Sequence, residues 1–286
     1  RPPFHFYFRD WRVYMKQWKF AVSSADEAPA TAPILLQGTV EENLQTASNL
    51  GYDAIEVHTR EDVELDYEAI RAAYQHTGTR VSMVITGRLN TEGMCSLVAD
   101  EPYIVSATMD GMRQYIDMAQ KLGAGIVIGW VKGNVPKGGK REKYLDRLAK
   151  NLRVLAAYGA ERNVKLNLEV INRYEVNIFT TARETMDFLE KYQLDNCYVH
   201  LDTFHMGIDE CDPVEAIRLC HGKLGYFHLA DNSRRYPGSG QFDFSCILNA
   251  LEEIGYDGYL AVECLPWPTG KEAAQRALMF LKDLSM

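Results

Sequence analysis

The sequence lacks both a long apolar run and an excess of positive charge. None of its 286 residues falls in an apolar stretch approaching the roughly 18 residues of a membrane-spanning helix, so we expect no membrane partner. It has 31 lysine and arginine residues against 39 aspartate and glutamate residues, a formal charge of −8. Because binding to a phosphate backbone requires a basic surface, this charge disfavours nucleic acid as a partner. A small uncharged or metal-chelated ligand is easier to accommodate.

Cysteine is also sparse. The six cysteines are scattered, and no two follow the spacing C-x-x-C. This usage is typical of buried thiols in a reducing compartment and disfavours a disulfide framework, so we expect a cytoplasmic protein. Residues 1–14 (RPPFHFYFRDWRVY) contain neither the apolar segment nor the cleavage site of a signal peptide, and Met15 follows them. We interpret residues 1–14 as an extension ahead of the natural start and residues 15–286 as the folded domain.

Eight short β-rich runs alternate with helical stretches along the chain. Their first residues are Trp18, Asp53, Arg80, Ala124, Val164, Cys197, Leu224 and Tyr259. Several runs consist almost entirely of Val, Ile, Leu and Tyr, as expected of parallel strands that are covered on both faces. Because no composition break interrupts the alternation, it favours an α/β fold of one domain, a closed (β/α)8 TIM barrel. An open, doubly wound sheet in two domains is the alternative.

Local signals mark several helix starts. Thr39 with Glu42 and Thr181 with Glu184 fit capping boxes, in which a hydroxyl and a carboxylate each accept a free backbone amide. Asp212-Pro213 places a cap before a proline at the first helical position.

Two segments between the predicted elements are irregular. Residues 87–107 follow the third strand and residues 132–143 follow the fourth, and loops of this length usually carry function or are mobile. The lysine-rich segment 137–143 does not match a phosphate-binding P-loop, so we interpret it as a solvated lid. Arg88 is a second candidate for covering the site.

Metal-competent side chains lie at the ends of four consecutive predicted strands. Glu169 ends the fifth, Asp202 ends the sixth, His228 lies near the end of the seventh and Glu263 near the end of the eighth. In a barrel these ends converge on one mouth. Three carboxylates and one imidazole suit Mn²⁺, Mg²⁺ or Co²⁺, and Zn²⁺ stays open. Since unpaired buried carboxylates cost on the order of several kcal/mol, one shared divalent ion is a better explanation than four separately satisfied polar groups.

This arrangement predicts proton transfer next to a carbonyl. A divalent ion chelated by two neighbouring oxygens of a hydroxy-ketone polarises the carbonyl and favours an enediolate. A carboxylate whose pKa is raised by burial can serve as the base. Glu169 and Glu263 come from strands separated by two others, so they can approach a substrate from different sides. Two such groups meet the requirement for inverting a stereocentre.

Four segments carry a resemblance to a known superfamily. LEVINRYE (168–175), HLDTFHMGIDE (200–210), FHLADNSRRYPGSG (227–240) and VEC (262–264) resemble the metal-dependent sugar isomerases and epimerases with a xylose-isomerase-like barrel. Among these, the chain is most similar to the ketose 3-epimerases, which act on D-tagatose, D-psicose or L-ribulose. The resemblance covers most of the chain from Lys16 onward. It implies a (β/α)8 epimerase of a free or phosphorylated ketose that works through a metal-stabilised enediolate.

The resemblance also implies roles for individual residues. Glu169, Asp202, His228 and Glu263 would hold the metal, with Mn²⁺ as the first expectation, and Glu169 and Glu263 would form the acid/base pair. The residues that match substrate contacts are Glu175, His205 and Arg234. The alternatives are a loop salt bridge for Glu175 and a helix cap for His205. In place of Arg234, the neighbouring Arg235 could reach the pocket.

Three further residues are candidate substrate contacts from their place at strand ends. Glu56 and His58 end the second predicted strand, and either could instead support the ligands or the fold. Trp130 ends the fourth and offers an apolar wall. The chain departs from the ketose epimerases in Cys264-Leu265-Pro266-Trp267, where they continue with Pro-Phe, and in Asp231, where they often have a longer acidic residue.

Other reactions share the same parts. An aldose-ketose or inosose isomerase, a dehydratase, and a lyase subunit that cleaves C-glycosides of 3-keto sugars with a small partner subunit are the alternatives. A metal-dependent endonuclease is disfavoured by the acidic charge and by the seven histidines. A non-catalytic sugar-binding barrel is the remaining class. Because homo-oligomers are common in the families that the chain resembles, we expect a homodimer or homotetramer.

Overall fold

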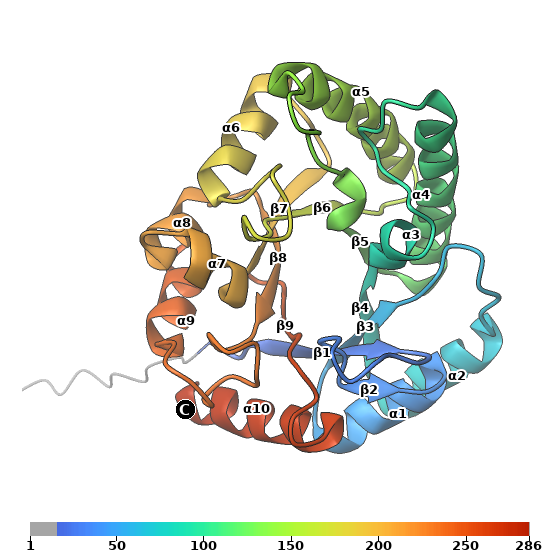
Figure 1. Ribbon diagram of the computed structural model, residues 1–286. Coiled ribbons are helices and arrows are strands. Elements are labelled where there is room, and N and C mark those ends of the chain that lie inside the picture. The colour runs from blue at the N-terminus through green and yellow to red at the C-terminus, as the bar shows by residue number, and fades with distance from the viewer. Residues whose placement is uncertain (1–15, 286) are drawn as a thin grey trace, which may run out of the picture.

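The strands form a closed parallel barrel (Figure 1). A computed structural model describes residues 16–285, so the interpretation of residues 1–14 lies outside the described residues. Within the described part the sheet order is β2-β1-β3-β4-β5-β6-β7-β8-β9, and β9 also pairs with β1, which closes the ring. The strands are β1 (Lys19–Ala25), β2 (Leu36–Gln37), β3 (Ala54–His58), β4 (Arg80–Ile85), β5 (Gly125–Ile128), β6 (Leu166–Glu169), β7 (Cys197–Asp202), β8 (Leu224–Leu229) and β9 (Tyr259–Val262). The predicted single-domain (β/α)8 barrel is confirmed, and β2 is a short addition beside the end of β1.

Helices surround this barrel (Figure 1). They are α1 (Val40–Leu50), α2 (Tyr67–Thr77), α3 (Gly87–Thr91), α4 (Pro102–Leu122), the 3₁₀ turn η1 (Trp130–Lys132), α5 (Arg141–Ala160), α6 (Ala182–Tyr192), α7 (Thr203–Asp209), α8 (Pro213–Leu219), α9 (Phe244–Glu253) and α10 (Gly270–Leu284). The segment 87–107 is less irregular than predicted, because α3 occupies its start. Pro102, at the first position of α4, also begins that helix inside the segment.

The helix starts show why these segments fold as they do. Thr39 and Glu42 form the predicted capping box, with reciprocal hydrogen bonds of 3.3 and 2.9 Å. Thr181 caps α6 by accepting the amide of Glu184 at 3.2 Å. The Glu184 carboxylate does not complete that box, because it accepts from the amide of Thr180 and pairs with Arg141 at the start of α5.

The barrel interior is apolar over much of its length and polar toward the C-terminal ends of the strands. Its apolar part includes Ala21, Ala54 and Ala261 together with Tyr226. The larger outer core packs the helices against the sheet. All six cysteines are unpaired. Among residues 16–285, no helix has the length and apolarity needed to cross a membrane. The mouth that the sequence indicated holds buried ionisable side chains, among them Glu169, Asp202 and His228.

Candidate metal and substrate site

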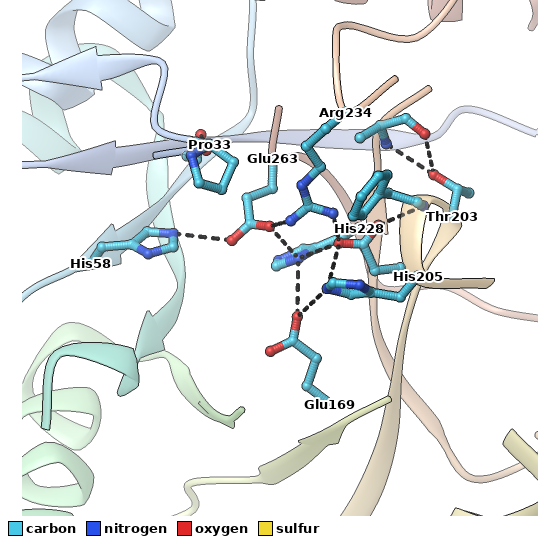
Figure 2. Close-up of polar contacts among 12 residues, drawn as sticks. Pro33, His58, Glu169, Thr203, His205, His228, Arg234 and Glu263 are labelled. Atoms are coloured by element: carbon cyan, nitrogen blue, oxygen red, sulfur yellow. Dashed lines mark hydrogen bonds and ion pairs between the residues drawn. The ribbon is translucent and has the colours of Figure 1, made fainter. Parts of the chain in front are cut away.

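The four candidate ligands meet at one point in the barrel mouth (Figure 2). Glu169 is the last residue of β6, Asp202 the last of β7, His228 the fifth of β8, and Glu263 follows β9 directly. One nitrogen or oxygen atom from each lies within 4.8 Å of the others. Three of these side chains carry a carboxyl group and the fourth an imidazole, and all four are buried. The parallel strands therefore bring together four side chains, the first and last of which are 94 residues apart in the sequence.

The Nδ1 atom of His228 lies at the centre of this cluster. It is 3.4 Å from Oε2 of Glu263, 3.6 Å from Oδ2 of Asp202 and 3.9 Å from Oε1 of Glu169. Within residues 16–285 this buried nitrogen has no hydrogen-bond partner. A buried polar atom without a partner is rare in folded proteins. One imidazole nitrogen facing three carboxylate oxygens fits a divalent cation with oxygen-rich coordination.

Glu56 lies behind His228 and is not among the residues that line the cavity, whereas the sequence left open whether it contacts the substrate or supports the ligands. Its side chain is fully buried, and it accepts hydrogen bonds from Nε2 of His228 at 2.9 Å and from the hydroxyl of Tyr226 at 3.2 Å. Burial opposes ionisation, but the charge of His228 outweighs it and lowers the pKa of Glu56. Because Glu56 binds the Nε2 proton, Nδ1 is the nitrogen that faces the carboxylates, and it can bind a cation once its own proton is lost. The strand-end pattern could not separate this position from a cavity position.

Arg234 reaches the cluster from the loop after β8. Its guanidinium contacts Oδ2 of Asp202 and Oε2 of Glu263, and its Cζ lies 4.8 Å from the ring of Phe204. Despite burial, this guanidinium lowers the pKa of Asp202. Arg235 is exposed and lies 3.9 Å from the ring of Trp267 instead. Of the two neighbouring arginines, Arg234 is therefore the one that lines the cavity.

Glu169 has the environment of a general base. Burial, followed by the charge of Glu263, raises the pKa of Glu169 to about 8 in the metal-free protein. Gly129 provides the space for this side chain, since a Cβ at Gly129 would lie 2.5 Å from Oε2 of Glu169. Lys132, on the next turn, is fully buried, and its Nζ donates to the carbonyl of Gly129 at 3.2 Å. Burial lowers the pKa of Lys132 to about 8, although Glu169 acts in the opposite direction.

Asn172, which was not among the predicted site residues, links His205 and Glu175. The amide of Asn172 donates to Nδ1 of His205 at 2.8 Å and to Oε1 of Glu175 at 2.8 Å. The other Glu175 oxygen accepts from the indole of Trp130 at 3.2 Å. Nε2 of His205 lies 3.9 Å from Asp202 and 4.0 Å from Glu169. Burial lowers the pKa of His205 to about 4, so its imidazole is neutral at pH 7.

These groups open into a cavity of about 630 Å³. Glu169, Glu175, His205, Arg234 and Glu263 line it, together with His58 and Trp130. Nε2 of His58 lies 3.7 Å from Glu263 (Figure 2). The same atom is 3.1 Å from Glu56. The volume falls within the range of small-molecule sites.

Pro33, which the sequence pattern did not indicate, and Arg88, which it did, complete the cavity. Pro33 lies beside His58 and Glu263 on the β1–β2 loop (Figure 2). Arg88 lines the rim and pairs with Asp26 at 2.7 Å. Residues 137–143, predicted as a solvated lid, do not line the cavity. A signal for Asn172 was available, because it lies inside the segment LEVINRYE between Glu169 and Glu175, whereas nothing in the sequence marked Pro33.

Comparison with known proteins identifies the family. The family model described as the xylose isomerase-like TIM barrel matches residues 44–284. The chain belongs to the xylose isomerase-like TIM barrel family. The L-ribulose 3-epimerase of Methylomonas sp. (strain DH-1) is 30% identical over 258 residues, which cover 83% of this chain and 88% of that protein. The D-psicose 3-epimerase of Enterocloster bolteae is 30% identical over 233 residues, 77% of this chain and 75% of that one.

A solved structure agrees on the fold. The structure of an L-ribulose 3-epimerase superposes with a TM-score of 0.81 at 24% identity, covering 94% of this chain and 95% of that chain. The xylose isomerase-like barrel resemblance expected from the four segments is thereby confirmed, and the named relatives are carbohydrate epimerases.

Proposed function

We propose that this chain is a metal-dependent ketose 3-epimerase. The observation that carries the proposal is the meeting of Glu169, Asp202, His228 and Glu263 around a nitrogen that has no hydrogen-bond partner among residues 16–285. The similarity to an L-ribulose 3-epimerase and a D-psicose 3-epimerase supports the choice of reaction. Free or phosphorylated ketoses are the substrate class.

The four clustered side chains would hold the ion, with Mn²⁺ as the first candidate and Mg²⁺ or Co²⁺ as alternatives. Three carboxylates and one imidazole form a hard, oxygen-rich donor set, which suits these ions. A divalent ion bound there supplies a Lewis acid that polarises a ketose carbonyl and makes the adjacent C–H more acidic. Glu56 supports this by holding the imidazole of His228 in place through the 2.9 Å hydrogen bond.

Glu169 and Glu263 would move the proton. They approach the imidazole of His228 from different sides (Figure 2), and both line the cavity. One carboxylate would take the proton from C3 and the other would return a proton to the opposite face, which inverts the carbon. Burial, which raises the pKa of Glu169 in the metal-free protein, gives this carboxylate a higher proton affinity than an exposed one, as a general base requires. The handedness of the substrate would decide which glutamate acts first.

The remaining cavity residues would position the sugar. Arg234 and the neutral His205 offer N–H donors beside the ligands, and Glu175 offers an acceptor held by Asn172. Trp130 would provide an apolar wall, and His58 a polar contact at the opposite rim. These groups would bind the hydroxyl and carbonyl oxygens of a ketose and hold its C3 beside the two carboxylates.

The cellular setting is part of the proposal. The six unpaired cysteines support a reducing, cytoplasmic environment. We also propose a homodimer or homotetramer, to be measured by light scattering. If a small second chain copurified instead, the lyase alternative that acts on 3-keto-glycosides would be favoured.

The test is an isotope experiment. The protein is stripped with a chelator, reloaded with Mn²⁺ and incubated in D₂O with D-psicose, D-tagatose and L-ribulose, each free and phosphorylated, and with a 3-keto-glycoside. The expected result is formation of the C3 epimer with deuterium at C3, read by NMR. Deuterium at another carbon, loss of the aglycone, or no exchange with any sugar would each overturn the proposal.

A further inference from the structure

A buried carboxylate organises the loop between β8 and α9. Asp231 is fully buried, and its oxygens accept hydrogen bonds from five backbone amides of this loop. The donors are Asn232 at 2.9 Å, Gly238 at 3.1 Å, Gly240 at 2.8 Å, Gln241 at 2.9 Å and Phe242 at 3.2 Å. Gly240 also provides the space, since a Cβ there would lie 2.3 Å from Oδ1 of Asp231. This one side chain therefore accepts five of the hydrogen bonds that hold residues 231–242, and Asn232 adds another by accepting from the amide of Gln241 at 3.0 Å.

Arg234 lies on the same loop in a backbone conformation that needs support. Its φ is +59°, in the left-handed region that is unfavourable for residues other than glycine. The amide of Arg234 donates to the carbonyl of Asp231 at 2.8 Å, and the amide of Asp231 donates to the carbonyl of Arg235 at 2.9 Å. The carbonyl of Arg234 accepts from the amide of Leu265 at 2.7 Å. The loop is thus joined to the segment that follows Glu263.

The side chain of Arg234 makes the functional contacts that this loop delivers. Its guanidinium contacts both Asp202 and Glu263 (Figure 2). Asp231 itself does not line the cavity and lies three residues after His228, so it can act on the site only through the loop. A small displacement of a binding group is enough to weaken its contacts.

We propose that Asp231 is a positioning residue that holds Arg234 against Asp202 and Glu263, and that through Arg234 it sets how tightly the substrate binds. The second half of this statement rests on the proposed function, because it takes Arg234 as a substrate contact. The positioning of Arg234 by Asp231 concerns the loop alone. The loop and the effect on substrate binding are therefore tested in separate experiments.

Hydrogen exchange tests the loop. In Asp231→Asn the side chain keeps its size, but one oxygen becomes an NH₂ group that cannot accept. We expect the amides of residues 238–242 to exchange on the order of tenfold faster in the variant, with the barrel strands unchanged. Asp243→Asn is the matched control, because Asp243 lies at the end of the same loop and, within the described part of the chain, accepts from Ser245 and Cys246 and not from residues 238–242. Unchanged exchange at residues 238–242 in Asp231→Asn would overturn the proposal.

A double-mutant cycle tests the link to Arg234. Asp231→Asn should raise KM on the order of tenfold, with kcat changed far less and with metal content equal to that of the wild type. In an Arg234→Ala background the same substitution should change KM by less than about twofold, because the group that it positions is gone. If Asp231→Asn raised KM equally in both backgrounds, Asp231 would have a general structural role and the proposal would fail.

A crystal structure keeps the proposal testable even if no ketose is a substrate. The Asp231→Asn variant should show the Arg234 guanidinium withdrawn from Asp202 and Glu263. If the guanidinium kept both contacts, the positioning role would be refuted whatever the reaction. Loss of these contacts together with absence of ketose exchange in the wild type would refute the proposed function alone.

Discussion

The carboxylate of Glu56 accepts a hydrogen bond from Nε2 of His228 at 2.9 Å, while Nδ1 of the same ring faces Glu169, Asp202 and Glu263. The two ring nitrogens therefore have separate partners. One is occupied by a fully buried carboxylate and the other is left for a cation. A histidine that ligates a metal commonly donates its second nitrogen in this way, which fixes the tautomer and increases the basicity of the ligand.

Substituting Glu56 should therefore weaken metal binding without touching a ligand. Glu56→Gln keeps the size of the side chain and removes its charge, and we expect the Kd for Mn²⁺ to rise about 10- to 100-fold. Isothermal titration of the chelator-stripped protein measures this. Glu253→Gln on the outer face of α9, where Glu253 pairs with Arg218, is the control and should bind as the wild type does. An unchanged Kd in Glu56→Gln would show that the hydrogen bond does not support the site.

His228→Ala should lower the metal content itself. It removes the only nitrogen of the four-residue cluster, so elemental analysis of the purified variant should find well under one equivalent of metal. The fold should persist, because the outer hydrophobic core does not involve this residue. Wild-type stoichiometry in the variant would remove His228 from the ligand set.

Glu263→Gln should abolish turnover while leaving the fold intact. The substitution removes a charge from the cluster and one of the two proposed proton carriers together, so we expect kcat to fall by several orders of magnitude. Circular dichroism and thermal unfolding check that the barrel is unchanged, and product NMR measures the rate. Activity near that of the wild type would contradict the role of Glu263 in the reaction.

The barrel and the convergence of the four candidate ligands could both be predicted from the sequence, because both follow from the regular alternation of strands and helices. Residues at the ends of consecutive parallel strands must converge, so Glu169, Asp202 and Glu263 could be grouped without coordinates. Contacts between distant loops follow no such period. Nothing in the sequence placed Pro33 beside Glu263. The sequence also did not distinguish Glu56 from His58, although Glu56 faces His228 and His58 faces the cavity.

Arg234→Ala should act mainly on substrate binding. The guanidinium lines the cavity and does not belong to the cluster of candidate ligands, so we expect KM to rise with a smaller change in kcat. Arg234→Lys should restore little, because a single ammonium cannot reproduce the two directed contacts to Asp202 and Glu263. Steady-state kinetics with the best ketose of the panel measures both values. If KM rose in Arg235→Ala and not in Arg234→Ala, the substrate contact would have to be reassigned.

Metal binding should depend on pH through Glu169. In the metal-free protein, burial and the charge of Glu263 raise the pKa of Glu169 to about 8, so below that pH its carboxyl carries a proton that an incoming cation must displace. His228, whose pKa is also raised by Glu56 and Glu263 against the effect of burial, must lose a proton before Nδ1 can bind. Mn²⁺ affinity should therefore fall as the pH decreases from 8 to 6, and binding at pH 6.5 should release at least about one proton per ion. Titration calorimetry in two buffers of different ionisation enthalpy measures that release. A constant affinity over this range with no proton released would mean that neither Glu169 nor His228 is protonated in the metal-free protein, and the account of the cluster would have to change.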